Sequence, residues 1–567
     1  MGRTTGKGKT FTRIAAAGIL FLLLLVAGAQ AETGMVFRAA SPDICNETVI
    51  SRKGSNGYVL SLPGSWDAGK VTLTVEGAEV IYLGNEGVEI RQGEAADLSA
   101  FLGRRVPIYN KKHYYLGDVT ILQGSEIPAL FLTVDAKGLQ KANRNKNAGI
   151  TEGHAVYTEA DGTVAYDGGI TQMKGRGNNT FLYSKKPYQI KLEEKTSLSG
   201  MAKARTWVLL ANWNDISMLR NQIVLDIARE TGLRYAVSCV QADVWINGEY
   251  NGLYLITEKI QIKKGRVELK DLEDETEAVN DNPPESYPRY KTGTGSLPLI
   301  RGYQIDHDPE DITGGYLFTL EKYSRLRDYS VPGFRTKNDL SVQIKEPTCP
   351  SRAQTEYLGN LVNGMHLAVI ASDGVNPSTG MHYTEYIDTD SFALKFLIED
   401  WCKDYDFIGG SQYMYKDSDE RDPLIYAGPA WDYDLSFGNM ADRGYYATGN
   451  YITAISRRSS NLYWLLSLHT EFTDRVNAIW QERFRPAAAV LLGEKAAPEG
   501  SALRSLDEYA EGIRDSAEMN FRRWGVSKST DAAAGSSFGN AVAYLKKWIA
   551  ERTAFMDGVY GITEKHE

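Results

Sequence analysis

The order in which strand-like and helix-like patterns follow one another constrains the fold of this chain most strongly. Alternating or continuous apolar runs, typical of strands, fill the first half of the chain. One amphipathic helix interrupts them, and it is predicted to begin after Asp215, its N-cap, and to end at Gly232. Helix-like patterns dominate the last third, including Phe392–Trp401 and 540–557. This segregation predicts an α+β fold in two lobes and excludes an alternating βαβ array.

The first 31 residues have the pattern of a secretory signal. Basic residues precede the apolar run Ala15–Ala29, and Ala29-Gln30-Ala31 fits a cleavage site before Glu32. The alternative is an uncleaved anchor, but this apolar run is short for a bilayer span. No later stretch of the sequence is long and apolar enough to cross a membrane. We therefore expect an exported protein with residues 1–31 removed and no stable membrane span.

The charge balance narrows the range of partners. The chain has 63 Lys and Arg against 72 Asp and Glu, which gives a net charge of −9. Removal of residues 1–31, which carry four basic residues and no acid, lowers that charge by four, to −13. A body this acidic argues against nucleic-acid binding, whose affinity comes mostly from phosphate neutralisation. It favours basic or neutral partners, or a metal ion between acidic groups.

Patterning along the chain predicts two domains after the signal. Residues 32–125 are predicted to form a small all-β domain, because their apolar residues alternate and show no long helical period. The second domain, 126–567, begins near the buried-strand run Ala129–Val134. Inside it, Asn247-Gly248 predicts a hairpin turn. Residues 271–311 are acidic and carry prolines, which predicts a surface insertion or flexible loop.

The four cysteines lie far apart in the sequence and include no CxxC pair. Four thiols in a chain of this size do not make a disulfide scaffold, and a zinc ribbon is excluded. We expect most of them to be buried apolar residues. The alternative is that two of them form a single disulfide bond. They are Cys45, Cys239, Cys349 and Cys402.

Four carboxylates fall within a short glycine-bearing segment: Asp404, Asp406, Asp432 and Asp434. Oxygen donors without a nearby histidine suit a hard cation such as Mg²⁺. The competing interpretation is a set of solvated loop acids. The surrounding aromatic residues disfavour full solvation, and a partly buried acid group requires a metal ion or a base. These aromatic residues are Trp401, Phe407, Tyr413, Trp431 and Phe437.

A second segment, from Lys174-Gly175-Arg176-Gly177 to Lys191, joins a glycine-rich turn to basic residues and a strand. Glycines let backbone N–H groups approach phosphate oxygens, and Lys or Arg supply the opposite charge. A plain hairpin is the competing interpretation. Nucleotide phosphates bridged by Mg²⁺ require both a basic loop and an acidic oxygen site. The pairing of the two segments therefore predicts a nucleotide site.

At these residues the chain resembles the CotH family, the spore-coat-protein-H kinases, from about Ile127 to Gly558. The resemblance implies a bilobal, atypical protein-kinase-like fold, with the 36–125 domain outside it. Several segments in order carry it: Lys174-Gly-Arg-Gly-Asn-Asn, Lys186-Pro-Tyr-Gln-Ile-Lys191-Leu, Trp207-Val-Leu-Leu-Ala-Asn-Trp-Asn-Asp215 with Arg220-Asn221, Asn247-Gly-Glu-Tyr-Asn-Gly-Leu-Tyr-Leu-Ile-Thr-Glu258, and Gly428-Pro-Ala-Trp-Asp432-Tyr-Asp434.

The resemblance also implies residue roles. Lys191 would hold the nucleotide phosphates, and Asp406 would orient the substrate hydroxyl and accept its proton. Asp432 would be the main metal ligand, with Asp434 as the second candidate. Ser411 stands where kinases place a metal-binding Asn, five residues after the catalytic Asp. A hydroxyl is a poorer ligand for a second Mg²⁺ than an amide carbonyl, so this departure weakens the catalytic interpretation.

Four further residues receive weaker assignments from the resemblance. Lys174 and Arg176 would contact phosphates, and Glu258 lies where the two lobes would join, as a nucleotide contact or a structural residue. Glu230 is a candidate partner of Lys191 by position alone.

The leading hypothesis is an exported kinase that uses ATP and Mg²⁺ or Mn²⁺. It would phosphorylate Ser or Thr of extracellular or spore-coat proteins, with Ser/Thr-rich or basic segments as substrates. The alternative from another class is a non-catalytic, kinase-like surface or matrix protein for adhesion or coat assembly. A two-carboxylate glycosidase using Asp406 and Asp432 is a third hypothesis, but it leaves the basic glycine segment unexplained.

Overall fold

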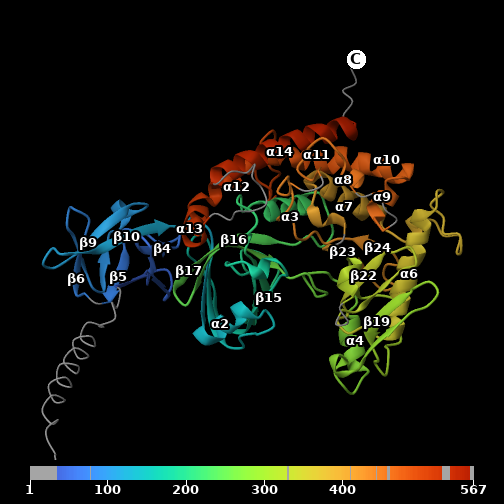
Figure 1. Ribbon diagram of the computed structural model, residues 1–567, viewed down its shortest axis with the longest axis horizontal. Helices are drawn as coiled ribbons and strands as arrows, with labels where there is room; N and C mark the ends of the chain where they lie inside the picture. Colours follow the sequence, from blue (N-terminus) through green and yellow to red (C-terminus); the bar gives the residue numbers. More distant parts are fainter. Residues whose placement is uncertain are drawn as a thin grey trace, which may run out of the picture. The chain divides into compact units, whose positions relative to one another are not determined.

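The computed structural model describes residues 35–76, 78–327, 331–408, 410–441, 444–455, 457, 460–525 and 537–561 (Figure 1). The predicted signal segment, 1–31, lies outside the described residues. The described residues divide into two compact units, one formed by 35–62 with Trp66–Gln123 and the other by Pro63–Ser65 with the described residues from Gly124 onward. Among the described helices, none has both the length and the apolar character needed to cross a bilayer.

The first unit consists of strands, with one 3₁₀ turn at Ser99–Phe101. One sheet has the order β3-β4-β10-β9-β6-β7, and β2-β1-β5-β8 lie side by side in another. Alternate residues point inward, so that Phe37, Leu60 and Leu73 are buried. The strands are β1 Val36–Ala40, β2 Thr48–Ile50, β3 Arg52–Gly54, β4 Gly57–Leu62, β5 Val71–Glu76, β6 Val80–Leu83, β7 Val88–Arg91, β8 Glu94–Ala96, β9 Arg105–Asn110 and β10 Tyr115–Gln123.

The second unit begins with a closed seven-stranded barrel. Its strands follow the order β15-β14-β13-β12-β11-β16-β17, and β15 also pairs with β17, which closes the ring. Its interior holds a separate apolar core that includes Met173, Ile190, Trp207 and Ile256. The strands are β11 Ala129–Val134, β12 Gly153–Thr158, β13 Val164–Gly175, β14 Tyr188–Thr196, β15 Ala204–Leu210, β16 Cys239–Ile246 and β17 Glu249–Glu258. Helix α2 (Ala136–Arg144), capped by Asp135, follows β11.

A second sheet of seven antiparallel strands follows, in the order β18-β19-β21-β22-β20-β23-β24. Helix α6 (Arg352–Ile370) packs on β19 and β21 of this sheet (Figure 1). The strands are β18 Arg289–Thr292, β19 Leu299–Tyr303, β20 Tyr316–Leu320, β21 Gly333–Arg335, β22 Ser341–Glu346, β23 Gln412–Lys416 and β24 Ile425–Ala427.

Of the two alternatives predicted for 271–311, a surface insertion or a flexible loop, the flexible loop is wrong. The segment contains helix α4 (Leu272–Ala278), a 3₁₀ turn at Pro284–Ser286 and strands β18 and β19. All five residues of β19, Arg301 included, are buried, because the strand pairs with β18 and β21 and α6 packs on it. The acidic residues that suggested a loop belong to this packed segment. Asp271, for example, is the N-cap residue of α4.

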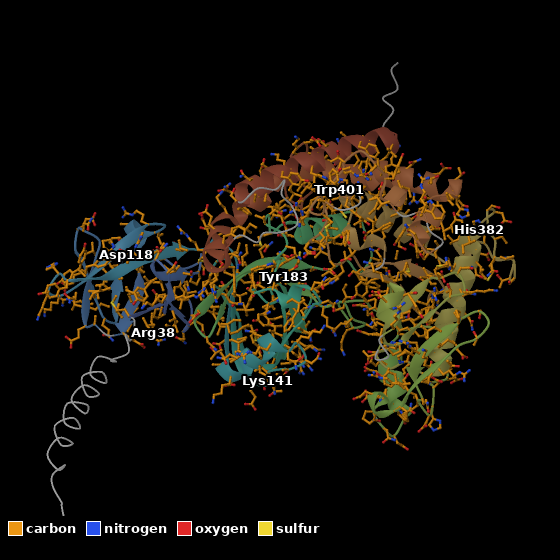
Figure 2. The ribbon with its side chains drawn as sticks, viewed as in Figure 1. Arg38, Asp118, Lys141, Tyr183, His382 and Trp401 are labelled. Carbon is orange, nitrogen blue, oxygen red and sulfur yellow. The ribbon has the colours of Figure 1, made fainter. Side chains whose placement is uncertain are left out.

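Helices form most of the remaining chain and share one large core with the second sheet and with the outer face of the barrel. The buried Trp401 of α7 belongs to this core (Figure 2). The helices are α3 Arg220–Glu230, α5 Tyr323–Leu326, α7 Thr389–Cys402, α8 Ile452–Ile455, α9 Leu462–Leu466, α10 Thr470–Ile479, α11 Arg485–Leu491, α12 Leu506–Gly512, α13 Arg514–Trp524 and α14 Phe538–Val559, with a π-helical turn at Trp480–Phe484.

Helix α3 begins at Arg220, four residues later than predicted. Asp215 lies in the preceding turn, where its carboxylate accepts hydrogen bonds from the backbone N–H groups of Ser217 and Arg220. Asp215 therefore accepts the first N–H of the helix from outside the helix. The predicted capping role of Asp215 is confirmed, but the predicted start of the helix is wrong. Helix α3 ends at Glu230. Gly232, two residues later, has a φ of 87°, which glycine adopts readily.

Candidate functional site

The β23–β24 hairpin brings together the two halves of the acidic segment. Asp406 lies in a 3₁₀ turn (Tyr405–Ile408) shortly before β23, and Asp432 lies shortly after β24. Met414 pairs with Ala427, and the Gly428 N–H donates to the Tyr413 carbonyl at 2.9 Å. This register returns the chain to the start of β23, so the two carboxylates meet at one end of the hairpin.

Asp432 and Asp434 project from a tightly held turn. The Ser411 hydroxyl donates to Asp432 Oδ2 at 3.0 Å, and Asn214 Nδ2 donates to Asp434 Oδ2 at 3.2 Å. Burial, and then the charge of Asp432, raise the pKa of Asp434 to about 8. Asp434 therefore retains its proton near neutral pH unless a cation stabilises the carboxylate.

The start of α3 fixes this turn from the opposite side. Asn221 Oδ1 accepts the backbone N–H of Tyr433 at 2.7 Å, and Arg220 Nε donates to the Ser436 carbonyl at 3.0 Å. Arg220 is itself buried and paired with Asp215 at 2.5 Å. Asn214-Asp215 before α3 and Arg220-Asn221 at its start thus hold the turn that presents Asp432 and Asp434.

Sequence reasoning included Asp404 in the acidic cluster but gave it no individual role, although it lies two residues before Asp406. It is 1% exposed, and neither carboxylate oxygen has a hydrogen-bond partner among the described residues. Burial raises its pKa well above the usual range, and the charges of Glu399, Asp406 and Asp432 raise it further. Such a carboxylate is held neutral or requires a cation.

Positive charge reaches the acids from the outer face of the barrel. Arg176, just beyond β13, lies with its guanidinium 5.1 Å from the ring centre of Trp431, the residue before Asp432. The attraction of Asp432 opposes the burial that lowers the pKa of Arg176. Lys174, two residues earlier on β13, is half-buried. Of the two cations predicted from the glycine segment, Arg176 therefore lies beside the acidic turn.

Lys191 lies on the same outer face of the barrel as Lys174, because Lys174 pairs with Gln189, two residues before Lys191. On β14 its neighbours Ile190 and Leu192 point into the barrel core, so Lys191 points outward, and it is exposed. It forms no ion pair with a described residue. Glu230 does not pair with Lys191, because its carboxylate accepts the Ser501 hydroxyl at 2.5 Å.

Glu258 has a structural partner. Its carboxylate pairs with Arg266 at 2.5 Å and accepts the Ser238 N–H at 3.1 Å. Burial raises its pKa, and Arg266 opposes that shift. Glu258 also lines a cavity of about 360 Å³ beside Pro429, close to the acidic turn. It therefore lies next to the site, with its charge already paired.

The residues present fit a Mg²⁺ ion held in part by a substrate. Among the described residues, no group of three or more His, Cys, Asp or Glu side chains is arranged to hold a metal ion. Mg²⁺, however, is usually held by one or two carboxylates together with waters and substrate phosphates, not by an all-protein cage. Asp432 and Asp434 supply two such carboxylates, with the Ser411 hydroxyl beside them.

Sequence reasoning gave no individual role to two residues of this site, Asp404 and Asn214. Asn214 and Asp404 stood inside motifs that had been recognised, but only the fold shows that Asn214 contacts Asp434 and that Asp404 is buried without a partner. All four cysteines lie in the described part of the chain, and none forms a disulfide.

Comparison with known proteins agrees with the motifs. A family model described as CotH kinase protein matches residues 173–556, which is narrower at its start than the resemblance from Ile127. No curated protein matches the chain. The match covers more than half of the sequence and includes both the glycine segment and the acidic turn, so this chain belongs to the CotH kinase family.

Proposed function

We propose that this chain is an exported protein kinase with a bilobal kinase-like architecture. It would use ATP and Mg²⁺, or Mn²⁺, to phosphorylate Ser or Thr hydroxyls of extracellular or spore-coat proteins. One observation carries the proposal: Arg176 reaches the turn that presents Asp432, so cations and acidic oxygen donors share one site. Phosphoryl transfer depends mainly on positioning and charge neutralisation, and these groups supply both.

Each residue has a distinct role in this proposal. Asp406 would accept a hydrogen bond from the substrate hydroxyl and then its proton. Arg176 and Lys174 would bind phosphate oxygens. Asp432 and Asp434 would hold the Mg²⁺ ion, which neutralises phosphate charge when bound. The acidic surface of the chain would favour basic, Ser/Thr-rich substrates, since the net charge is −9 before any signal is removed.

The test is label transfer from γ-labelled ATP with Mg²⁺ or Mn²⁺ to a basic Ser/Thr-rich protein. The wild type should transfer label, whereas Asp406→Asn and Asp432→Asn should transfer at least a hundredfold less. Asp474→Asn removes a carboxylate from the exposed face of α10 and should leave transfer unchanged. If wild type transfers no label with either metal, or all variants transfer equally, the kinase proposal fails.

The first unit offers an observation that favours the second candidate function, a non-catalytic surface-binding protein. Tyr114 and Tyr115 are 67% and 58% exposed beside the exposed His113. The ring of Tyr115 contacts that of Tyr109, and His113 contacts Tyr82. Exposed aromatic surface of this kind is typical of a binding face.

Binding to matrix polysaccharide or to a cell surface tests this candidate. A double variant, Tyr114→Ser with Tyr115→Ser, should lose binding, whereas Asp406→Asn should retain it. If the double variant binds as the wild type does, this aromatic surface is not the binding face. The two candidate functions are therefore separated by variants in different units of the chain.

A further inference from the structure

The acidic segment 271–311 has no role in the proposed site, although it forms one edge of the sheet that contains β23 and β24. Strand β18 is the end strand of that sheet, and β19 is its only partner among the described strands. A cavity of about 590 Å³, here called the edge groove, adjoins β18. It is lined by Tyr290 and Thr292 of β18, Asp306 and Asp308 after β19, and Arg352 and Glu356 of α6.

The register of β18 leaves backbone groups on its outer side without a partner. The Gln304 N–H donates to the Pro288 carbonyl at 2.8 Å, so the alternate positions Tyr290 and Thr292 also bond to β19. The N–H and C=O of Lys291 therefore point away from β19, and no described residue bonds to them. A free strand edge of this kind can pair with an extended peptide.

The side chains of the edge groove favour a basic ligand. Its three carboxylates stand against one guanidinium, that of Arg352, which already pairs with Glu356 at 2.8 Å. Asp306 and Asp308 are exposed and form no ion pair with a described residue. Lys291 alternates with Tyr290 and Thr292, so its own side chain belongs to the opposite face of the sheet. An added strand with Lys or Arg at alternate positions would direct those cations toward the free carboxylates.

One row of cross-strand pairs joins the edge groove to the acidic site. Gln412, at the end of this row, is the first residue of β23 and follows Ser411 directly. The row crosses five strand spacings, which correspond to about 24 Å. An extended chain covers that distance with about seven residues. The row consists of Thr292, Ile300, Phe334, Val342, Leu320 and Gln412.

We infer that the edge groove binds a basic, extended segment of the protein substrate as an added strand beside β18. This inference rests on the proposed function and adds a docking surface to it. Backbone pairing with β18 would hold the segment, and Asp306 and Asp308 would select its cations. The docked segment and the phosphorylated Ser or Thr would lie at least about seven residues apart in the substrate chain.

Fluorescence anisotropy tests docking separately from catalysis. The probe is a labelled peptide of alternating Lys and Val, which has no hydroxyl to phosphorylate, and the whole protein is titrated into it. Asp306→Asn with Asp308→Asn should weaken binding by roughly fivefold or more, because two charge pairs are lost. The matched control, Asp515→Asn with Glu518→Gln, removes the same charge from exposed positions of α13 and should bind as wild type does.

Variants of Lys291 test the backbone pairing. Lys291→Pro removes the outward N–H and should weaken binding of the same peptide, whereas Lys291→Ala keeps that N–H and should bind as wild type does. Proline is tolerated in an edge strand where the N–H faces outward. The acidic double variant, whose substitutions lie at exposed positions, decides the test if Lys291→Pro does not fold.

Label transfer to peptides with a single Ser tests the spacing. A basic segment about twelve residues from that Ser should give a KM roughly fivefold lower than one about three residues away. The acidic double variant should abolish this difference and leave kcat unchanged.

The outcomes separate this inference from the proposed function. If wild type binds the Lys-Val peptide through the edge groove but transfers no label, the proposed function fails and the peptide-binding surface stands. If wild type transfers label and the double variant matches it in peptide binding and in KM, only the inference fails. A wild-type dimer that Lys291→Pro converts to a monomer would overturn the inference by identifying the occupant as a second copy of the chain.

Discussion

The hydroxyl of Ser411 donates to Asp432 Oδ2 at 3.0 Å across the β23–β24 hairpin, and both residues have positive φ. The φ angles are 57° for Ser411 and 75° for Asp432, so both residues have left-handed backbone conformations. Asn is among the non-glycine residues that tolerate such a backbone best. An amide at position 411 is therefore compatible with the local backbone.

We predict that Ser411→Asn folds as wild type and binds Mg²⁺ or Mn²⁺ in the presence of nucleotide two- to tenfold more tightly. An amide carbonyl is a better hard-cation ligand than a hydroxyl. Ser411→Ala, which loses the contact with Asp432, should bind the ion more weakly. Calorimetric titration of Mn²⁺ into each variant with saturating nucleotide checks both. Identical affinities in all three proteins would exclude position 411 from the metal site.

We predict that Asp404→Asn stabilises the protein at alkaline pH. A raised pKa means that folding favours protonated Asp404, so its cost appears as pH rises above the ordinary carboxyl value of about 4. The neutral, similarly shaped Asn does not carry that cost. We expect the unfolding free energy of the variant to exceed that of wild type by about 1 kcal/mol at pH 8 and to match it at pH 4.

Chemical unfolding at several pH values, without added divalent ions, measures this difference. Asp474→Asn, at an exposed position on α10, is the matched control and should show no such pH dependence. A variant less stable than wild type at pH 8 would indicate that the Asp404 carboxylate has a favourable partner in the folded protein.

Local patterns in the sequence predicted individual elements well. The run Ala129–Val134 is β11 with the predicted bounds, and the helix predicted at 540–557 lies inside α14. The hairpin prediction at Asn247-Gly248 is confirmed, because both residues have positive φ between β16 and β17. Short-range periodicity and turn chemistry decide such features, and both can be read from neighbouring residues.

Long-range pairing could not be predicted in the same way. The barrel closes because β15 pairs with β17, and no local pattern specifies which strand lies beside another. The contact of Asn214 with Asp434 spans 220 residues and depends on the α3 turn. Charge and glycine content identified the two functional segments in the sequence. The residues that hold these segments in place could be identified only from the fold.

The hairpin turn gives a prediction about stability. We expect Gly248→Val to destabilise the second unit by ~1–2 kcal/mol, because φ at this position is 82° and a β-branched residue is strained there. Gly539→Ala in α14 is the opposite control. It has ordinary helical φ and no atom near an added Cβ, so it should stabilise by ~0.5 kcal/mol. Chemical unfolding measures both, and an unaffected Gly248→Val would contradict the turn geometry.

The pKa of Asp434 predicts that cation binding releases a proton. With a pKa of about 8, this carboxyl is protonated near pH 7 and must lose its proton before it can bind Mg²⁺. Affinity for Mg²⁺ in the presence of nucleotide should therefore rise with pH until about pH 8 and then level off. Calorimetry in two buffers of different ionisation enthalpy should detect close to one extra released proton at pH 6.5 and almost none at pH 9.5. Asp434→Asn should lose this release, and an unchanged proton count in that variant would assign the proton to another group.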